Sequence, residues 1–216
     1  MPSTGELIQA AYARVKVRRT EILTTHIQDA IMELNLLQAK MDNMGPNLWT
    51  VDQVTLPLTS AQATYSVPAE TIMILDAWIT LQGIDRIIFP LSRSEYSAIP
   101  NKTDQGYPSQ FWFDRTISPT LTLWLTPNSN GPYTLTYFRY RQIYDAVIQN
   151  GYNPEAPVRW LDALVAGLAH RLSRIYAPEL EQTRKMDADE AWHIAAQQDV
   201  ENVSMSIVPG LIGYYR

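Results

Sequence analysis

The spacing of apolar residues in this 216-residue chain changes twice, and this change constrains the fold most. Near both ends, apolar residues recur every three or four positions, which is typical of helices that bury one face. Between Trp49 and Tyr140, threonine, β-branched and aromatic residues alternate, and Pro, Gly and Asn interrupt them, as in strands and turns. Helices, then strands, then helices again predict an α+β fold.

We expect a helical bundle formed by the N- and C-terminal helices, with an antiparallel β-rich module inserted between them. The predicted organisation is residues 1–46 for the N-terminal helices, 47–150 for the β-rich module, 151–203 for the C-terminal helices and 204–216 for a C-terminal docking tail.

Local signals place four helices. Ser3 and Glu6 form a capping box at the start of a helix over residues 3–17. A longer helix spans 20–44, and Gly45 and Pro46 end it. A third helix starts at Pro157 and breaks at Pro178, and a fourth covers 179–202. The expected buried stripes are Ile27, Ala30, Leu34, Leu37, Met41 and Met44; Leu161, Leu164, Val165, Leu168, Leu172 and Ile175; and Ala188, Ala191, Trp192 and Ala195.

The middle of the chain reads as short strands. Alternating residues at 121–125 and 134–140 flank a turn-rich segment at 126–132, which predicts a β-hairpin. Residues 92–99 fit a short helix. The other predicted strands cover 51–57, 63–67, 72–81, 86–89 and 110–114.

Composition excludes several classes of protein. The chain has no cysteine, which excludes disulfides, thiolate zinc sites and cysteine nucleophiles and fits folding in a reducing cytoplasm. No apolar run approaches the ~20 residues of a membrane-spanning helix. Residues 1–6 lack the basic and apolar regions of a secretory signal. The net charge of −5 disfavours a protein that grips nucleic acid.

No catalytic, cofactor-binding or metal-ligating residue is predicted, and we expect no enzyme. The phosphate loop and the GxGxxG, GxSxG and HExxH motifs are absent from the sequence. His26, His170 and His193 show no paired ligand spacing and read as packing or surface residues. The run 187–190 lacks the pattern of a calcium loop and reads as a solvated acidic helix face. Paired acids that cleave glycosidic bonds stay open as an alternative.

Charge and apolar character concentrate in three segments. Residues 179–201 hold seven acidic and two basic residues, a local net charge equal to that of the whole chain. A basic cluster at 14–19 fits a helix C-terminus or a contact with phosphate. The apolar, aromatic segment 207–216 would be a solubility hazard if left bare, so we expect it to dock on another chain.

Seven short motifs follow one another along the chain. They are residues 45–49 (GPNLW), 64–68 (TYSVP), 88–96 (IFPLSRSEY), 106–108 (GYP), 111–115 (FWFDR), 121–127 (LTLWLTP) and 157–161 (PVRWL). In this order they resemble the head-to-tail adaptor proteins of tailed bacteriophages, including the tail tubular or packaged-DNA-stabilising proteins of short-tailed phages, over about residues 28–210.

The resemblance implies a structural virion protein of the neck or tail, made in the host cytoplasm. Such adaptors form a dodecameric ring below the portal protein, contact a downstream tail or nozzle protein, and continue the channel through which DNA passes without specific binding. No membrane is involved. The implied portal-docking residues are Leu211, Ile212, Tyr214, Tyr215 and Arg216, and Asp187, Asp189 and Glu190 are the channel-lining candidates, because an acidic wall repels phosphate.

Three other functions remain open from the sequence. One is a virion-associated peptidoglycan hydrolase, supported only by paired acids. Another is a different tail ring component, such as a nozzle or stopper. The third is a carbohydrate-binding β-module, against which the flanking helices argue.

Overall fold

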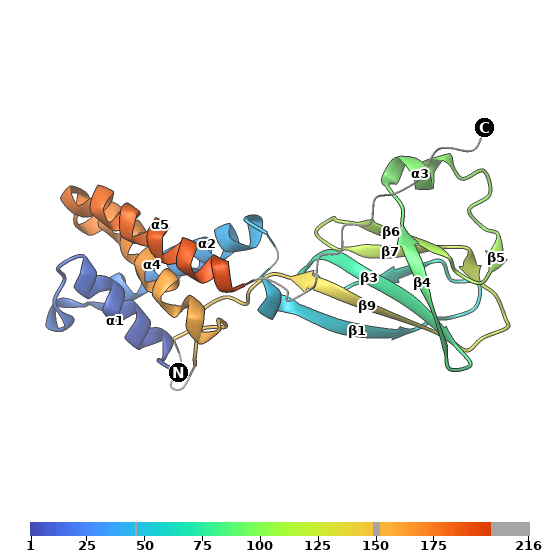
Figure 1. Ribbon diagram of the computed structural model, residues 1–216, viewed down its shortest axis with the longest axis horizontal. Coiled ribbons are helices and arrows are strands. Elements are labelled where there is room, and N and C mark those ends of the chain that lie inside the picture. The colour runs from blue at the N-terminus through green and yellow to red at the C-terminus, as the bar shows by residue number, and fades with distance from the viewer. Residues whose placement is uncertain (46, 149–151, 200–216) are drawn as a thin grey trace.

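The computed structural model describes the chain except residues 46, 149–151 and 200–216. Figure 1 shows an elongated molecule, with helices from both ends of the chain on one side and a curled sheet on the other. The chain passes from the helices into the sheet before β1 and returns after β9. The predicted α+β fold is confirmed.

The helical part forms where the sequence predicts it, with shifted ends. Lys16 adopts a left-handed backbone with a φ of 64°, which stops α1 at Arg14 instead of residue 17. The second helix begins at Thr24, since residues 19–21 form a separate 3₁₀ turn. Its predicted start at residue 20 was therefore wrong. The four long helices are α1 (Thr4–Arg14), α2 (Thr24–Asn43), α4 (Leu161–Tyr176) and α5 (Glu181–Gln198).

Helix α4 is the centre of the bundle, because it packs against α1, α2 and α5. Gly167 lets α2 approach closely, since a Cβ at this position would lie only 2.9 Å from a methyl of Leu37. Most of the predicted stripes are buried. Met44 and Ile175 are each more than half exposed, which corrects the prediction. Met44 lies beyond the last turn of α2, and Leu172 and Ser173 occupy the buried side of the last turn of α4.

The sheet has seven strands in the order β1-β9-β3-β4-β6-β7-β2. A separate pair of two-residue strands, β5 (Gln105–Gly106) and β8 (Thr126–Pro127), lies beside it. The short helix α3 (Arg93–Ala98) follows β4, as predicted, with Ser92 and Glu95 as its capping box. The seven strands are β1 (Val51–Pro57), β2 (Thr64–Ser66), β3 (Thr71–Leu81), β4 (Ile84–Pro90), β6 (Gln110–Asp114), β7 (Thr120–Trp124) and β9 (Tyr133–Arg141).

Strand pairing differs from the prediction in two ways. The sheet is mixed rather than purely antiparallel, because β4 and β6 pair in parallel at Phe89 and Pro90. The predicted hairpin between residues 121–125 and 134–140 was wrong. Strand β7 pairs with β2 and β6, whereas β9 pairs with β1 and β3. The nine residues of β9 pair along most of their length with β1 on one edge and β3 on the other. The five-residue β7 is too short to replace either strand.

Two hydrophobic cores result. One lies among the helices and includes Trp160, which packs between Trp49 and Trp192 with ring centroids 5.2 and 4.8 Å away and the rings inclined by 50° and 69°. The other lies inside the curled sheet. Its largest fully buried members are Tyr137, Ile79, Ile88, Leu121 and Leu123.

The end of β9 ties the two parts together. The Tyr140 hydroxyl lies 3.0 Å from the carbonyl oxygens of both Asp42 and Gly45, at the end of α2. It also accepts a hydrogen bond from Asn47 Nδ2 at 3.3 Å. The Asp42 carboxylate accepts the Ile143 backbone N–H at 3.1 Å. Tyr140 and Asp42 together thus hold both crossings between the helices and the sheet in place.

Two buried arginines flank Tyr140 on the same strand. The Arg139 guanidinium donates to both carboxylate oxygens of Asp52, with its Nε 2.6 Å from Oδ1, and to Glu70 at 3.2 Å. Arg141 forms a two-point pair with Glu155. Arg141 Nε also lies 3.3 Å from Asp52 Oδ2. Such bidentate pairs fix geometry as well as charge.

This junction shifts the pKa values of its acids in opposite directions. Hydrogen bonding to Arg139 is the main cause that lowers the pKa of Asp52. Burial is the main cause that raises the pKa of Asp42. Asp52 therefore stabilises the fold when it is ionised, whereas burial of Asp42 disfavours its charged form.

We expect Arg139→Met to destabilise the protein by about 3 kcal/mol at pH 7. This value is the lower end for a broken buried ion pair, because Asp52 and Glu70 keep some contact with water. Urea unfolding would measure the effect. Arg115→Met is the control, since Arg115 is exposed and forms none of the ion pairs in the described chain.

The ion pair between Arg139 and Asp52 also makes the stability of the protein depend on pH. The folded-state pKa of Asp52 lies below its unfolded value, so the stabilisation is complete above about pH 4 and is lost as pH falls through the folded value. The stability gap between wild type and Arg139→Met should therefore narrow in acid. A gap that stays constant down to pH 3, or equals that of Arg115→Met, would contradict this role.

Candidate functional site

The predicted portal-docking residues Leu211, Ile212, Tyr214, Tyr215 and Arg216 lie outside the described residues. Their docking role stays a prediction.

One of the three channel-lining candidates, Asp189, leaves α5 on a different side from Asp187 and Glu190, which are i and i+3 neighbours. Asp187 pairs with Arg184 at 2.9 Å, one turn earlier. Asp189 lines a pocket between helices, and Glu190 is exposed. Successive helical residues are rotated by about 100°, so Asp187 and Asp189 project roughly 160° apart. The structure therefore does not bring the three acids together on one face, and their lining role stays a prediction.

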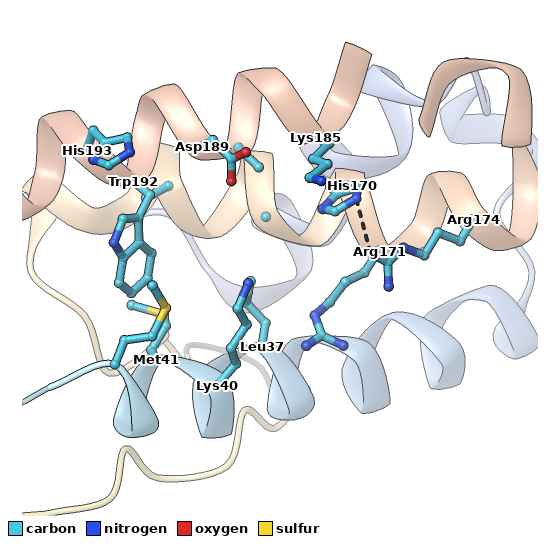
Figure 2. Close-up of a pocket in the computed structure, with 14 residues that line it drawn as sticks. Leu37, Lys40, Met41, His170, Arg171, Arg174, Lys185, Asp189, Trp192 and His193 are labelled. Carbon is cyan, nitrogen blue, oxygen red and sulfur yellow. Dashed lines mark hydrogen bonds between the residues drawn. The ribbon is translucent and has the colours of Figure 1, made fainter. Parts of the chain in front are cut away.

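A pocket of about 390 Å³ lies between α2, α4 and α5. Figure 2 shows Met41 of α2 beside the Trp192 ring of α5 at one end of this pocket. Small residues of α4, including Ala163 and Gly167, also line it. This end offers an apolar surface that a bulky side chain can fill.

The rest of the pocket is rich in cations. Arg171 and Arg174 line it and are held by Glu33 and Glu181, at 3.0 and 3.1 Å. Lys40 reaches in from α2, and Lys185 approaches from α5 (Figure 2). In the described part of the chain, neither lysine takes part in an ion pair. The pocket can therefore attract an anionic group, although the chain as a whole is acidic.

The pKa of His170 depends on the burial and the charges in this part of the pocket. Burial is the main cause that lowers the pKa of His170, and the charges of Arg174 and Lys40 lower it further. Its Nε2 lies 3.3 Å from Arg174 Nη2. A carboxylate that would orient it as a general base does not bond to its ring in the described structure. His170 is thus a half-buried imidazole whose surroundings disfavour its charged form.

The other two histidines have different surroundings. His26 packs between Tyr12 and Tyr176, with ring centroids 5.6 and 4.9 Å away. His193 is exposed on α5 at the pocket rim. Among residues 1–45, 47–148 and 152–199, no group of three or more His, Cys, Asp or Glu could hold a metal ion. None of the helices described is long and apolar enough to cross a bilayer.

Sequence reasoning missed an exposed apolar surface on the sheet. Strands β3 and β4 form a hairpin whose tip, residues 82–87, is exposed on both faces. Ile84, Ile87 and Phe89 are 60%, 70% and 64% exposed. Isoleucine at positions 84, 87 and 88 breaks the alternation of a half-buried strand, and this irregularity was the available signal. Ile87 and Phe89 lie on one face of β4 and Ile84 on the other, so the hairpin exposes apolar side chains on both faces.

A comparison with protein-family models identifies the chain. The family model described as SU10 adaptor protein matches residues 3–208. The chain belongs to this family of phage head-to-tail adaptors, which are structural virion proteins. A search of the curated proteins finds no significant match.

The match also extends the resemblance seen in the sequence. That resemblance began near residue 28, whereas the family model includes α1 and the basic cluster at 14–19. In the structure, Arg14 of this cluster pairs with Asp162 of α4 at 2.6 Å. The N-terminal helix is therefore part of the adaptor.

The pocket charge can be tested through His170. We expect Lys40→Glu to raise the pKa of His170, because a cation that disfavours the imidazolium is replaced by an anion that favours it. NMR titration of the imidazole would measure the change. Lys16→Glu, outside the pocket, is the matched control. An unchanged pKa, or an equal shift in the control, would contradict the proposed proximity.

Proposed function

We propose that the protein forms a ring below the portal protein, extends the DNA channel and connects the capsid to the tail. The observation that carries this proposal is the family match over nearly the whole chain. Its place would be the neck of the virion. The partners are further copies of this chain, in a ring of twelve by resemblance, the portal protein and a downstream tail or nozzle protein.

The acidic character of the chain supports a channel that DNA traverses without binding. Phosphates and carboxylates repel each other, so a negative wall does not hold DNA. The proposal needs a net negative wall and does not need Asp187, Asp189 and Glu190 in particular, since Asp189 leaves α5 on a different side from the other two and lines the pocket.

A portal-binding assay tests the proposal. The purified protein is mixed with rings of the portal protein encoded in the same phage genome, and the products are examined by mass measurement and negative-stain microscopy. We expect a stoichiometric ring on the portal. A protein that ignores the portal even in excess would overturn the adaptor ring and make peptidoglycan hydrolysis the next activity to assay.

The same assay tests the docking tail. Deletion of residues 207–216 should abolish binding to portal rings and leave the fold intact, because the apolar residues of this segment would form the anchor. Circular dichroism and the unfolding midpoint are the controls for folding. Normal portal binding by the truncated protein would reject the anchor role.

A further inference from the structure

We propose that one exposed side of α5 packs into the pocket between α2, α4 and α5 of the neighbouring copy in the ring. This inference rests on the proposed ring and names the surfaces that would join its subunits. The α5 stripe, as we call this side, consists of Met186, Glu190 and Ile194.

The α5 stripe has no partner within the described chain. Met186 and Ile194 are 64% and 58% exposed. Glu190 is exposed between them and takes part in none of the ion pairs of the described residues. Because the three residues are spaced by four, they form one continuous row along the helix. An apolar-acidic-apolar row of this kind matches a helix that docks in a groove.

The pocket complements this row in chemistry. Asp189 is the acid that lines the pocket beside its four cations, and within the described residues neither Lys40 nor Lys185 forms an ion pair with it or with another acid, so a carboxylate from another copy can neutralise them. Met41 and Trp192 supply apolar surface at one end. Glu190 can therefore meet the lysines while an apolar neighbour in the stripe covers the Met41 and Trp192 surface.

The dimensions also agree. On α5 the pocket is lined from Lys185 to His193, and the stripe runs from Met186 to Ile194. Each stretch covers eight helical steps, or about 12 Å at the helical rise. The neighbouring helix would thus lie along the pocket over its full length.

The two surfaces face different ways around α5: at about 100° per residue, the mean direction of the pocket-lining residues and that of the α5 stripe differ by roughly 130°. Glu190 is two residues from Trp192, so it projects roughly 160° away from this pocket residue. A contact between two different faces is head-to-tail, and repetition of such a contact does not stop at a dimer but continues into a ring where the rotation between copies closes. The same arrangement places Glu190 between subunits and therefore away from the channel wall.

Charge reversal tests the contact on portal rings. Glu190→Lys, and separately the double change Lys40→Glu with Lys185→Glu, should each lower ring assembly about tenfold or more, because like charges then face each other. The chain that carries all three changes should recover assembly. Glu179→Lys is the matched control, since Glu179 is exposed just before α5 and outside the α5 stripe. Circular dichroism confirms that each variant is folded.

Cross-linking supplies a second measurement, which the cysteine-free sequence makes simple. One variant carries Ile194→Cys and another carries Lys40→Cys. A short bis-maleimide should join the two in mixed rings and should not join either variant to itself. A chain with both changes should give a ladder of oligomers. Ile117→Cys, on the sheet part and 97% exposed, is the control partner for each variant.

The outcomes separate this inference from the proposed function. Wild-type rings, loss and recovery by charge reversal, and a specific cross-link would support the contact. Normal rings of Glu190→Lys that slow DNA exit would place Glu190 in the channel and overturn it. Wild-type rings with no preference for the 194–40 cross-link would also overturn it and leave the adaptor ring intact. Failure of wild type to form rings at all would reject both proposals.

Discussion

The ion pairs that Arg139 and Arg141 form with carboxylates constrain the rest of the structure most strongly. Both side chains are buried near the end of β9, and a buried guanidinium without a carboxylate costs several kcal/mol. Their partners come from β1, from the turn before β3 and from the loop before α4. With Tyr140 between them, these contacts fix where the sheet ends and where the helices begin. The helices and the sheet thus meet through polar contacts of defined geometry, and each keeps its own apolar core.

This junction leaves the two ends of the elongated molecule free for different contacts. The helical end carries the cation-rich pocket and the α5 stripe. The sheet end carries the exposed tip of the β3–β4 hairpin, with Ile84 and Ile87. A head-to-tail adaptor has to meet unlike proteins, so separate surfaces on a fixed junction suit its role. We infer no partner for the hairpin, because its chemistry is apolar and does not discriminate among partners.

The sequence predicted most elements but not how distant elements meet. Helical spacing placed Leu34, Leu37 and Met41 correctly in the core, because one buried face determines such a pattern. Alternation found β7 and β9 but not their partners, since a period of two says nothing about the neighbouring strand. The pocket between α2, α4 and α5 could not be predicted from the sequence for the same reason. Lys40 and Lys185 are far apart in the chain, and only the packing of α2 and α5 on α4 brings them to one cavity.

In helix α5, the charge and exposure of single residues indicate binding surfaces better than the net charge of the segment does. The net charge of the acidic segment 179–201 equals that of the whole chain. Lys185, in the helix within this segment, nevertheless helps to line a cation-rich pocket. A helix that packs on one side needs a single apolar face, which Ala191 and Ala195 provide against the core. Met186 and Ile194 form a second apolar face in water, where they gain nothing in an isolated subunit. Burial of this second face by another copy would remove the mismatch, and Glu190 within it would then direct the helix to a site of opposite charge.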